Sequence, residues 1–234
     1  MRIVSRAAAK AVAVIAATAL LGACGGSPQA HTITITFIRH AESESNAAGV
    51  LDTTVPGPSL TPKGKDQAEQ VAHDLARNNY DGIYASTMVR TQQTAAPLAA
   101  ALGKQVEVLP GVQEIDAGWF EGKPVSMAAS TYLVAPTSWL QGDVQDRIPG
   151  SVSGTEFNNQ VTGAVQKIYA SGHRNPVVFS HVFTIMFWTL MNVKNPRDSL
   201  LTSHPLPNTG RVVITGNPAT GWTLVDWDGI RDLG

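Results

Sequence analysis

Apolar and polar residues follow two periods along this chain, one typical of strands and the other of helices. Ile33, Ile35 and Phe37 alternate with threonines, which predicts a strand beginning at about residue 32. A helix is predicted after Thr61-Pro62, because a threonine N-cap is followed there by proline at the first helical position and then by apolar residues at helical spacing.

The same alternation of strands and helices continues to the end of the chain. Residues 82–85 predict a short strand, Ser86 or Thr87 is expected to cap the next helix, and Gly103 is placed to end that helix. Further strands are predicted at 106–109, 177–179, 211–215 and 222–225, and further helices at 157–169 and 184–192. Strands separated by helices predict an α/β fold, a three-layer α/β/α sandwich with a mainly parallel central sheet.

One domain is expected to occupy residues 32–234, since no second boundary interrupts the pattern. Residues 123–153 fit neither period, which predicts an inserted, partly irregular segment.

The first thirty residues have a different pattern. Positive residues precede an apolar run from Ala11 to Leu21, and Leu-Gly-Ala-Cys24 follows, which resembles the lipobox of bacterial lipoproteins. The pattern predicts a signal peptide at 1–23, an acylated Cys24, a tether at 24–31, and an exported protein held by lipid on the outer face of the cell membrane. In the alternative, Cys24 is an ordinary small residue behind a signal peptide that is cleaved elsewhere.

Composition narrows the class of protein further. Of 234 residues, 43% are apolar and 15% charged, a balance typical of a globular domain. The net charge of −1, without a block of Lys and Arg, argues against a nucleic-acid binder. A single cysteine allows neither an intrachain disulfide nor a multi-cysteine metal site.

Candidate chemistry gathers just after the predicted strands. Arg39-His40 ends the first strand, Arg90 follows the second, Glu114 the third, and His181 the fourth. Ligands of open α/β sheets bind outside the carboxyl ends of the strands, so these side chains predict a small anion site with one acid beside it.

Five segments in order then resemble one family, the histidine phosphatase superfamily, in its phosphoglycerate mutase-like branch. They are residues 39–46 (RHAESESN), 60–64 (LTPKG), 83–95 (IYASTMVRTQQTA), 114–122 (EIDAGWFEG) and 178–181 (VFSH). Two positions depart from the family pattern: Ala41 and Val182 stand where glycine is usual.

The resemblance implies a set of roles. His40 would be a neutral nucleophile, and Glu114 would protonate the leaving oxygen. Arg39, Arg90 and His181 would hold the phosphoryl oxygens and supply positive charge. For Ser43 and Asn46, contact with substrate and local turn or cap hydrogen bonding stay open as alternatives. The remaining histidines lack a metal-ligand spacing, and no metal or other cofactor is expected.

Three functions follow from this reading. The first is a metal-independent phosphomonoesterase with a phosphohistidine intermediate, acting outside the cytoplasmic membrane on a small phosphorylated substrate. The second is a mutase-type phosphotransferase, and the third is a non-catalytic module that binds a phosphorylated ligand. The residues do not name the physiological substrate.

Overall fold

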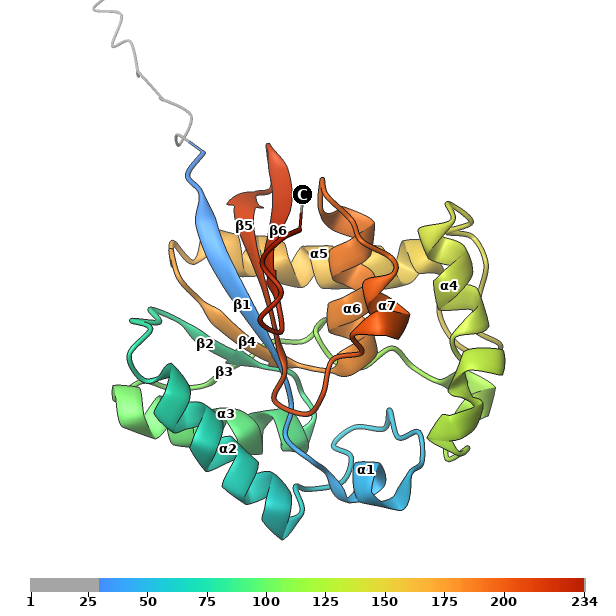
Figure 1. Ribbon diagram of the computed structural model, residues 1–234, viewed down its shortest axis with the longest axis horizontal. Coiled ribbons are helices and arrows are strands. Elements are labelled where there is room, and N and C mark those ends of the chain that lie inside the picture. Colours follow the sequence, from blue (N-terminus) through green and yellow to red (C-terminus); the bar gives the residue numbers. More distant parts are fainter. Residues whose placement is uncertain (1–29, 234) are drawn as a thin grey trace, which may run out of the picture.

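A central six-stranded sheet organises the computed structural model, which describes residues 30–233 (Figure 1). Its strands are β1 (Ile33–Arg39), β2 (Ile83–Ala85), β3 (Glu107–Val108), β4 (Val177–Ser180), β5 (Arg211–Asn217) and β6 (Gly221–Trp227). They lie in the order β3-β2-β4-β1-β5-β6. The β1–β4, β4–β2 and β2–β3 pairs are parallel, and the β1–β5 and β5–β6 pairs are antiparallel. In this described sheet β5 alone therefore runs against the other strands, which confirms the mainly parallel sheet.

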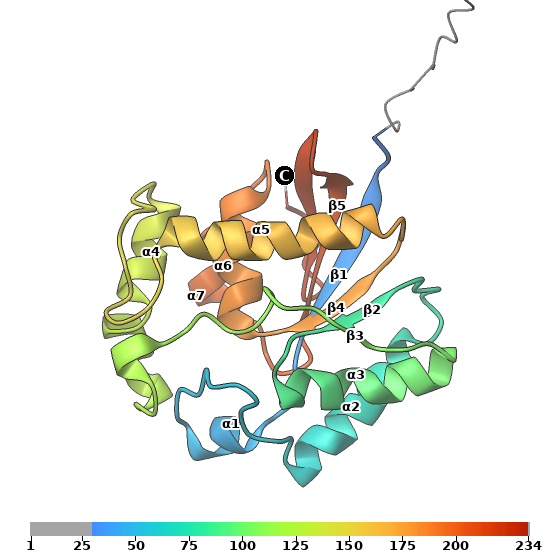
Figure 2. The same ribbon diagram turned by 180° about the vertical axis from the view of Figure 1, so that it is seen from behind.

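Helices cover both faces of the sheet and complete a three-layer sandwich. They are α1 (Glu44–Ala48), α2 (Pro62–Leu75), α3 (Val89–Leu102), α4 (Val134–Leu140), α5 (Gly154–Ala170), α6 (Val182–Asn192) and α7 (Leu200–Ser203). Helices α2 and α3 lie on one face, and α5 and α6 lie on the other (Figures 1 and 2). The α/β fold class predicted from the sequence is confirmed.

Successive apolar side chains of the central strands pack alternately into two separate cores, one on each face of the sheet. Val178 of β4 packs in the larger core, beneath α5 and α6, whereas its neighbours Val177 and Phe179 pack in the smaller core with residues of α2 and α3. Tyr84 and Ile83 of β2 divide in the same way. Successive side chains of a strand point to opposite faces, so a strand covered on both sides must be apolar at nearly every position.

The sequence predicted the start of α2 and the end of α3 correctly, but it predicted the wrong cap at the start of α3. The Thr61 hydroxyl accepts from the backbone N–H of Gly64 at 2.9 Å, and Gly103 ends α3 with a left-handed φ of 62°. Helix α3, however, has Met88 at its N-cap position without a side-chain cap, so the cap expected from Ser86 or Thr87 is not formed. The Ser86 side chain instead lies against His181.

Residues 123–153 form a short 3₁₀ segment (Val125–Ser130), α4 and loops. Their large side chains Tyr132, Trp139 and Ile148 are almost completely buried and belong to the larger core. The sequence of this segment lacks a regular hydrophobic period because turns separate these few buried side chains. The same side chains nevertheless make the segment part of the core.

The chain is packed against the domain from His31 onward. The backbone N–H of His31 donates to the Tyr169 hydroxyl at 3.0 Å, and its ring stacks on that of Tyr169 with centroids 4.6 Å apart. His31, expected at the end of the tether, is therefore part of the packed fold. The predicted signal peptide, Cys24 and the earlier tether residues lie outside the described residues, and no helix among residues 30–233 has the length and apolar character needed to cross a bilayer.

Candidate active site

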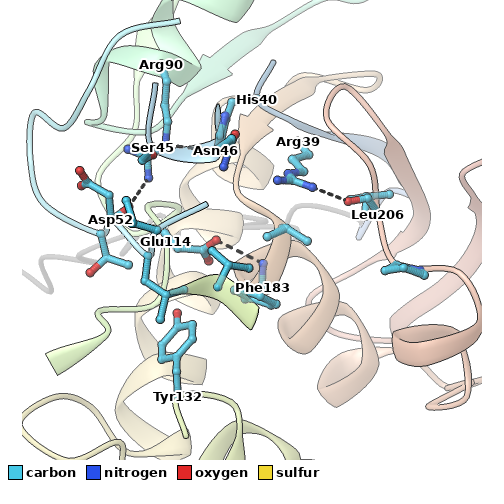
Figure 3. A pocket seen from close by; sticks show the side chains of 16 residues that line it. Arg39, His40, Ser45, Asn46, Asp52, Arg90, Glu114, Tyr132, Phe183 and Leu206 are labelled. Atoms are coloured by element: carbon cyan, nitrogen blue, oxygen red, sulfur yellow. Dashed lines mark hydrogen bonds between the residues drawn. The ribbon is translucent and has the colours of Figure 1, made fainter. Parts of the chain in front are cut away.

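A cavity of about 220 Å³ opens at the carboxyl end of β1 (Figure 3). It brings together Arg39 and His40 from the end of β1, Asn46 from α1, Arg90 from α3 and Glu114 from the loop that follows β3. The remaining lining residues are Ser45, Val50, Leu51, Asp52, Thr53, Val125, Tyr132, Val182, Phe183, Pro205 and Leu206. The four predicted site residues of this cavity that follow strands in the chain are Arg39, His40, Arg90 and Glu114. They meet because β1, β2 and β3 are parallel and end at one edge of the sheet.

His40 is held in the tautomer that a nucleophile requires. Its Nδ1 lies 2.7 Å from the carbonyl oxygen of Ala41, and because a carbonyl only accepts, Nδ1 carries the proton. Nε2 then presents a lone pair, which accepts from Arg90 Nε at 3.2 Å. Burial, and next the charges of Arg90 and Arg39, hold the pKa of His40 well below its ordinary 6.5. His40 is therefore a neutral imidazole at neutral pH.

Arg90 is buried and Arg39 is partly buried, and each has a donor that no described residue uses. Arg39 Nη1 donates to the carbonyl oxygen of Leu206 at 2.8 Å, and Arg90 Nη2 donates to that of Asp52 at 3.0 Å. Arg39 Nε and Arg90 Nη1 are buried without a hydrogen-bond partner among the described residues. Buried donors are nearly always paired, so a ligand with several acceptor oxygens, such as a phosphoryl group, suits this arrangement.

Glu114 lies at the amino end of α6, where backbone donors meet its carboxyl. Oε1 accepts from Thr184 N at 3.0 Å and from Ile115 N at 3.1 Å, and Oε2 lies 3.4 Å from Phe183 N. Burial raises the pKa of Glu114, against the opposing effects of these backbone hydrogen bonds and of Arg90. A carboxyl with a raised pKa beside an imidazole nucleophile can act as a general acid.

His181 lies beside His40 but does not line the cavity. The two rings have centroids 5.0 Å apart, and His181 Nε2 is 2.8 Å from Ser86 Oγ. Burial lowers the pKa of His181 well below 6.5, with Arg90 as the next cause. The low pKa makes the ring neutral at neutral pH, because burial disfavours a third cation beside two arginines. The Nδ1 of the ring has no partner among the described residues. The role of His181 in holding phosphoryl oxygens stays a prediction.

Ser43 and Asn46 have different roles in the structure. Ser43 is completely buried, caps α1 and forms a reciprocal capping box with Asn46, so of its two alternatives the structure supports local capping. Asn46 lines the cavity, and its Oδ1 accepts from Asn208 Nδ2 at 3.1 Å. Asn46 thus combines the two alternatives, with its side chain in the cap and at the cavity wall.

The loop after β1 is fastened by residues that the sequence pattern did not single out. Thr94 of α3 accepts from the backbone N–H of Ala41 at 3.0 Å, and Asn208 donates to the carbonyl oxygen of His40 at 3.0 Å. Ala41 does not have a positive φ, which explains why alanine fits there. Thr94 and Asn208 carried no signal in the sequence because both act across large chain separations.

Two other carboxylic acids of the motif segments, Glu42 and Glu121, lie away from the nucleophile. Glu42 pairs with Lys63 at 2.7 Å, and the Glu121 carboxylate accepts from the backbone N–H of Thr53 at 3.0 Å. Neither lines the cavity. Of these three acids, only Glu114 is placed to exchange a proton with a group held beside His40.

A mainly parallel sheet with helices on both faces, together with a neutral histidine between two arginines, suits an α/β protein that binds phosphoryl groups. The family model of the histidine phosphatase superfamily (branch 1) matches residues 35–229. The chain belongs to this superfamily, as its motifs indicated.

Curated relatives agree with this family, and solved structures agree with the fold. The chain is 50% identical over 222 residues to PE-PGRS family protein PE_PGRS11 of Mycobacterium tuberculosis; the match covers 88% of this chain and only 38% of that protein. It is 30% identical over 165 residues to phosphoserine phosphatase 1 of Hydrogenobacter thermophilus, covering 69% of this chain and 77% of that protein. Probable phosphoglycerate mutases also match.

Among solved structures, a mycobacterial glucosyl-3-phosphoglycerate phosphatase superposes with a TM-score of 0.69 at 19% identity, covering 86% of this chain and all of that one. At that identity the match shows the fold. The relatives named as phosphatases are phosphoric monoester hydrolases, the enzyme class that the sequence predicted.

Proposed function

We propose that the protein is a phosphomonoesterase that transfers a phosphoryl group first to His40 and then to water. The observation that carries the proposal is the state of His40: buried, neutral, with Nδ1 fixed by the Ala41 carbonyl and Nε2 directed at Arg90. Arginines on both sides and an acid with a raised pKa complete what phosphoryl transfer needs, which is mostly positioning and charge stabilisation.

In the first half-reaction, His40 Nε2 forms a bond to phosphorus while the bond from phosphorus to the leaving oxygen breaks. Arg39 and Arg90 hold the phosphoryl oxygens, and the Glu114 carboxyl gives its proton to the leaving alcohol. In the second half-reaction, the Glu114 carboxylate takes a proton from water. The water oxygen attacks phosphorus, and His40 is released as the neutral base that began the cycle. The proposal requires no metal ion.

His40→Ala tests the nucleophile. Turnover of every substrate is expected to fall to near background, because no covalent intermediate can form. The wild-type protein, mixed with labelled p-nitrophenyl phosphate and quenched in base, should carry an acid-labile label that His40→Ala lacks. Label on another residue, or turnover that survives His40→Ala, would exclude the mechanism.

The absence of a metal requirement needs a separate measurement. Activity is expected to survive prolonged treatment with a chelator, and vanadate is expected to inhibit by occupying the phosphoryl site. Loss of activity in chelator, with recovery on adding a divalent cation, would contradict a mechanism based on the two arginines.

A mutase is the second candidate, favoured by the match to probable phosphoglycerate mutases. It would use the same histidine and arginines, but it would return the phosphoryl group to a phosphoglycerate instead of water. Incubating the protein with 3-phosphoglycerate, with and without a bisphosphoglycerate primer, separates the two: a hydrolase releases inorganic phosphate, and a mutase forms the isomer. A protein that binds phosphate esters without turning them over would be the non-catalytic module.

We further propose the division of the chain suggested by its first residues: a signal peptide at 1–23, an acylated Cys24 with a short tether, and an exported phosphatase domain. The support is the sequence pattern around Cys24. The described fold adds a geometric consequence. The chain enters β1 at Ile33, whereas the cavity lies at the opposite, carboxyl end of that strand, where Arg39 and His40 line it. An anchor before residue 30 would therefore attach the domain by the end remote from its cavity.

A further inference from the structure

Two carboxylates stand beside the cavity wall in addition to Glu114. Asp52 lines the cavity, and its backbone carbonyl accepts from Arg90. Glu121 stands just behind the wall, where its carboxylate accepts from the backbone N–H of the lining residue Thr53 at 3.0 Å. After Glu114, these two carboxylates are the charges that most raise the pKa of Arg90, against the larger lowering effect of burial. Both carboxylates therefore lie close enough to Arg90 to raise its pKa.

The cations of the cavity wall are already assigned to the phosphoryl group. Arg39 and Arg90 are its only Lys or Arg residues within the described part of the chain, and each flanks His40. Beyond them the wall is apolar, acidic or polar without charge, and its neutral polar members besides His40 are Ser45, Asn46 and Thr53. Its apolar members are Val50, Leu51, Val125, Tyr132, Val182, Phe183, Pro205 and Leu206.

We infer that this site selects phosphomonoesters of small alcohols that carry no anionic group, and that Asp52 is a specificity-determining residue. The inference rests on the proposed phosphomonoesterase function. A carboxylate on the leaving group would lose part of its hydration against the apolar wall and would meet the like charge of Asp52 without a free arginine or lysine to pair with. A hydroxyl in its place loses less hydration and can donate to Asp52.

The size of the cavity supports a small leaving group. Its volume of about 220 Å³ is below the range of roughly 300–1,000 Å³ that is typical of pockets for drug-sized ligands. The phosphoryl group occupies the part beside His40, so the remaining space suits an alcohol of a few carbon atoms.

A matched pair of substrates tests the inference. Glycerol 3-phosphate and 3-phosphoglycerate differ at one end, where the first has a hydroxymethyl group and the second a carboxylate. We expect kcat/KM to be at least about tenfold higher for glycerol 3-phosphate, the scale of one unfavourable charge contact at a partly solvated site. Equal values, or a preference for 3-phosphoglycerate, would overturn the inference.

The variant Asp52→Asn tests whether the charge of Asp52 causes the expected substrate preference. The amide keeps an oxygen that can accept from Thr54, as Asp52 Oδ1 does at 3.1 Å, and the backbone contact with Arg90 is unchanged. The variant is expected to gain about fivefold or more in kcat/KM for 3-phosphoglycerate and little for glycerol 3-phosphate. Asp143→Asn is the control, because it removes the same charge from an exposed residue that does not line the cavity. An equal gain in both variants would mean that net charge, and not Asp52, sets the preference.

Failure of this inference and failure of the proposed function give different results. Absence of turnover of p-nitrophenyl phosphate and of both matched substrates would overturn the proposed enzyme. Turnover without the expected preference would overturn the selectivity alone. Calorimetric titration of His40→Ala with the two matched substrates gives a readout that needs no catalysis, and glycerol 3-phosphate should bind more tightly.

Discussion

Burial acts on the ionisable side chains at this site in opposite directions. It lowers the pKa values of His40 and His181, because an imidazolium loses hydration, and raises that of Glu114, because a carboxylate does. The same buried environment therefore favours the protonation state that the proposed reaction needs in each group: His40 without a proton on Nε2, and Glu114 with its proton. The surrounding arginines reinforce the first effect and oppose the second.

Glu114→Gln is expected to separate substrates by their leaving groups. The amide keeps the shape of the side chain and removes the proton donor. An alkyl phosphate should therefore lose roughly 10²–10⁴-fold in kcat, the range typical of lost general acid catalysis. p-Nitrophenyl phosphate leaves as a stable anion and should lose much less. Steady-state kinetics at neutral pH on both substrates decides this, and equal losses would remove Glu114 from the role of acid.

His181→Gln is expected to make stability less sensitive to acid. The folded-state pKa of His181 lies well below 6.5, so below pH 6.5 the unfolded chain binds a proton that the folded protein does not. Stability therefore falls on acidification by up to about 1.4 kcal/mol per pH unit for this residue. Glu114 acts in the opposite sense above its ordinary value of 4.5, because the folded protein keeps a proton that the unfolded chain has lost.

Comparing the pH dependence of the unfolding free energy in His181→Gln and in the wild type separates the contribution of His181 from that of Glu114, which both proteins share. Denaturant unfolding at several values from about pH 5 to 6.5 should show a shallower pH slope in His181→Gln than in the wild type. His73→Gln, in which the replaced side chain is 83% exposed on α2, should keep the wild-type slope. An unchanged slope in His181→Gln would mean that His181 is charged in the folded protein.

At the scale of elements, α2 is fixed to the loop that carries His40. A Cβ placed at Gly64, near the start of α2, would overlap the backbone of Glu42 two residues after His40. On the same face, the hydroxyl of Thr61 accepts from Gly64 N and the backbone N–H of Thr61 donates to the Glu42 carbonyl at 3.0 Å. The helix start and the nucleophile loop therefore touch through backbone, which has no rotamer to adjust.

Gly64→Ala is expected to lower both stability and activity. Overpacking against fixed backbone costs about 1–3 kcal/mol, and the displaced loop should move His40 away from its bond to Ala41. Gly163→Ala on α5 is the matched control, since a Cβ placed there meets no atom of the described residues within 4 Å, and alanine should stabilise the helix by about 0.5–1 kcal/mol. Unfolding curves and kcat for both variants test the contact, and similar behaviour of the two would disprove it.

At the scale of the whole molecule, strand β1 places the site and the start of the domain at opposite ends of the sheet. Strand β1 has seven residues, so about 20 Å of strand separates the entry of the chain near Ala30 from Arg39 and His40. A lipid attached before residue 30, as proposed, would therefore join the domain at the end of β1 that is opposite its cavity.

Cys24→Ala is expected to release the protein from membranes. Stable anchoring takes more than one acyl chain or signal, which an acylated lipoprotein cysteine would provide. Fractionation of cells expressing each form should find the wild type with membranes and the variant in the soluble fraction or the medium. Unchanged partitioning of Cys24→Ala would exclude acylation at this residue as the anchor.

Short-range chemistry explains why much of the fold could be predicted from the sequence. Threonine alternation in β1, the Thr61-Pro62 helix start and Gly103 at a helix end all act within a few residues, so each pattern identified its element. The Met88 cap position was mispredicted because Ser86 has a competing partner, His181, which lies 95 positions away in the chain. A local propensity yields when a tertiary contact uses the same hydroxyl.

By itself, the sequence determined which chemical groups are available at the ends of the strands: Arg39, His40, Arg90, Glu114 and His181. It did so because the carboxyl ends of parallel strands meet at one edge, whatever the details of packing. Only the tertiary structure decided their protonation states and which face the cavity. Desolvation depends on everything packed around a group, so burial made His181 neutral, enclosed Ser43 in a helix cap, and placed Asp52 on the cavity wall.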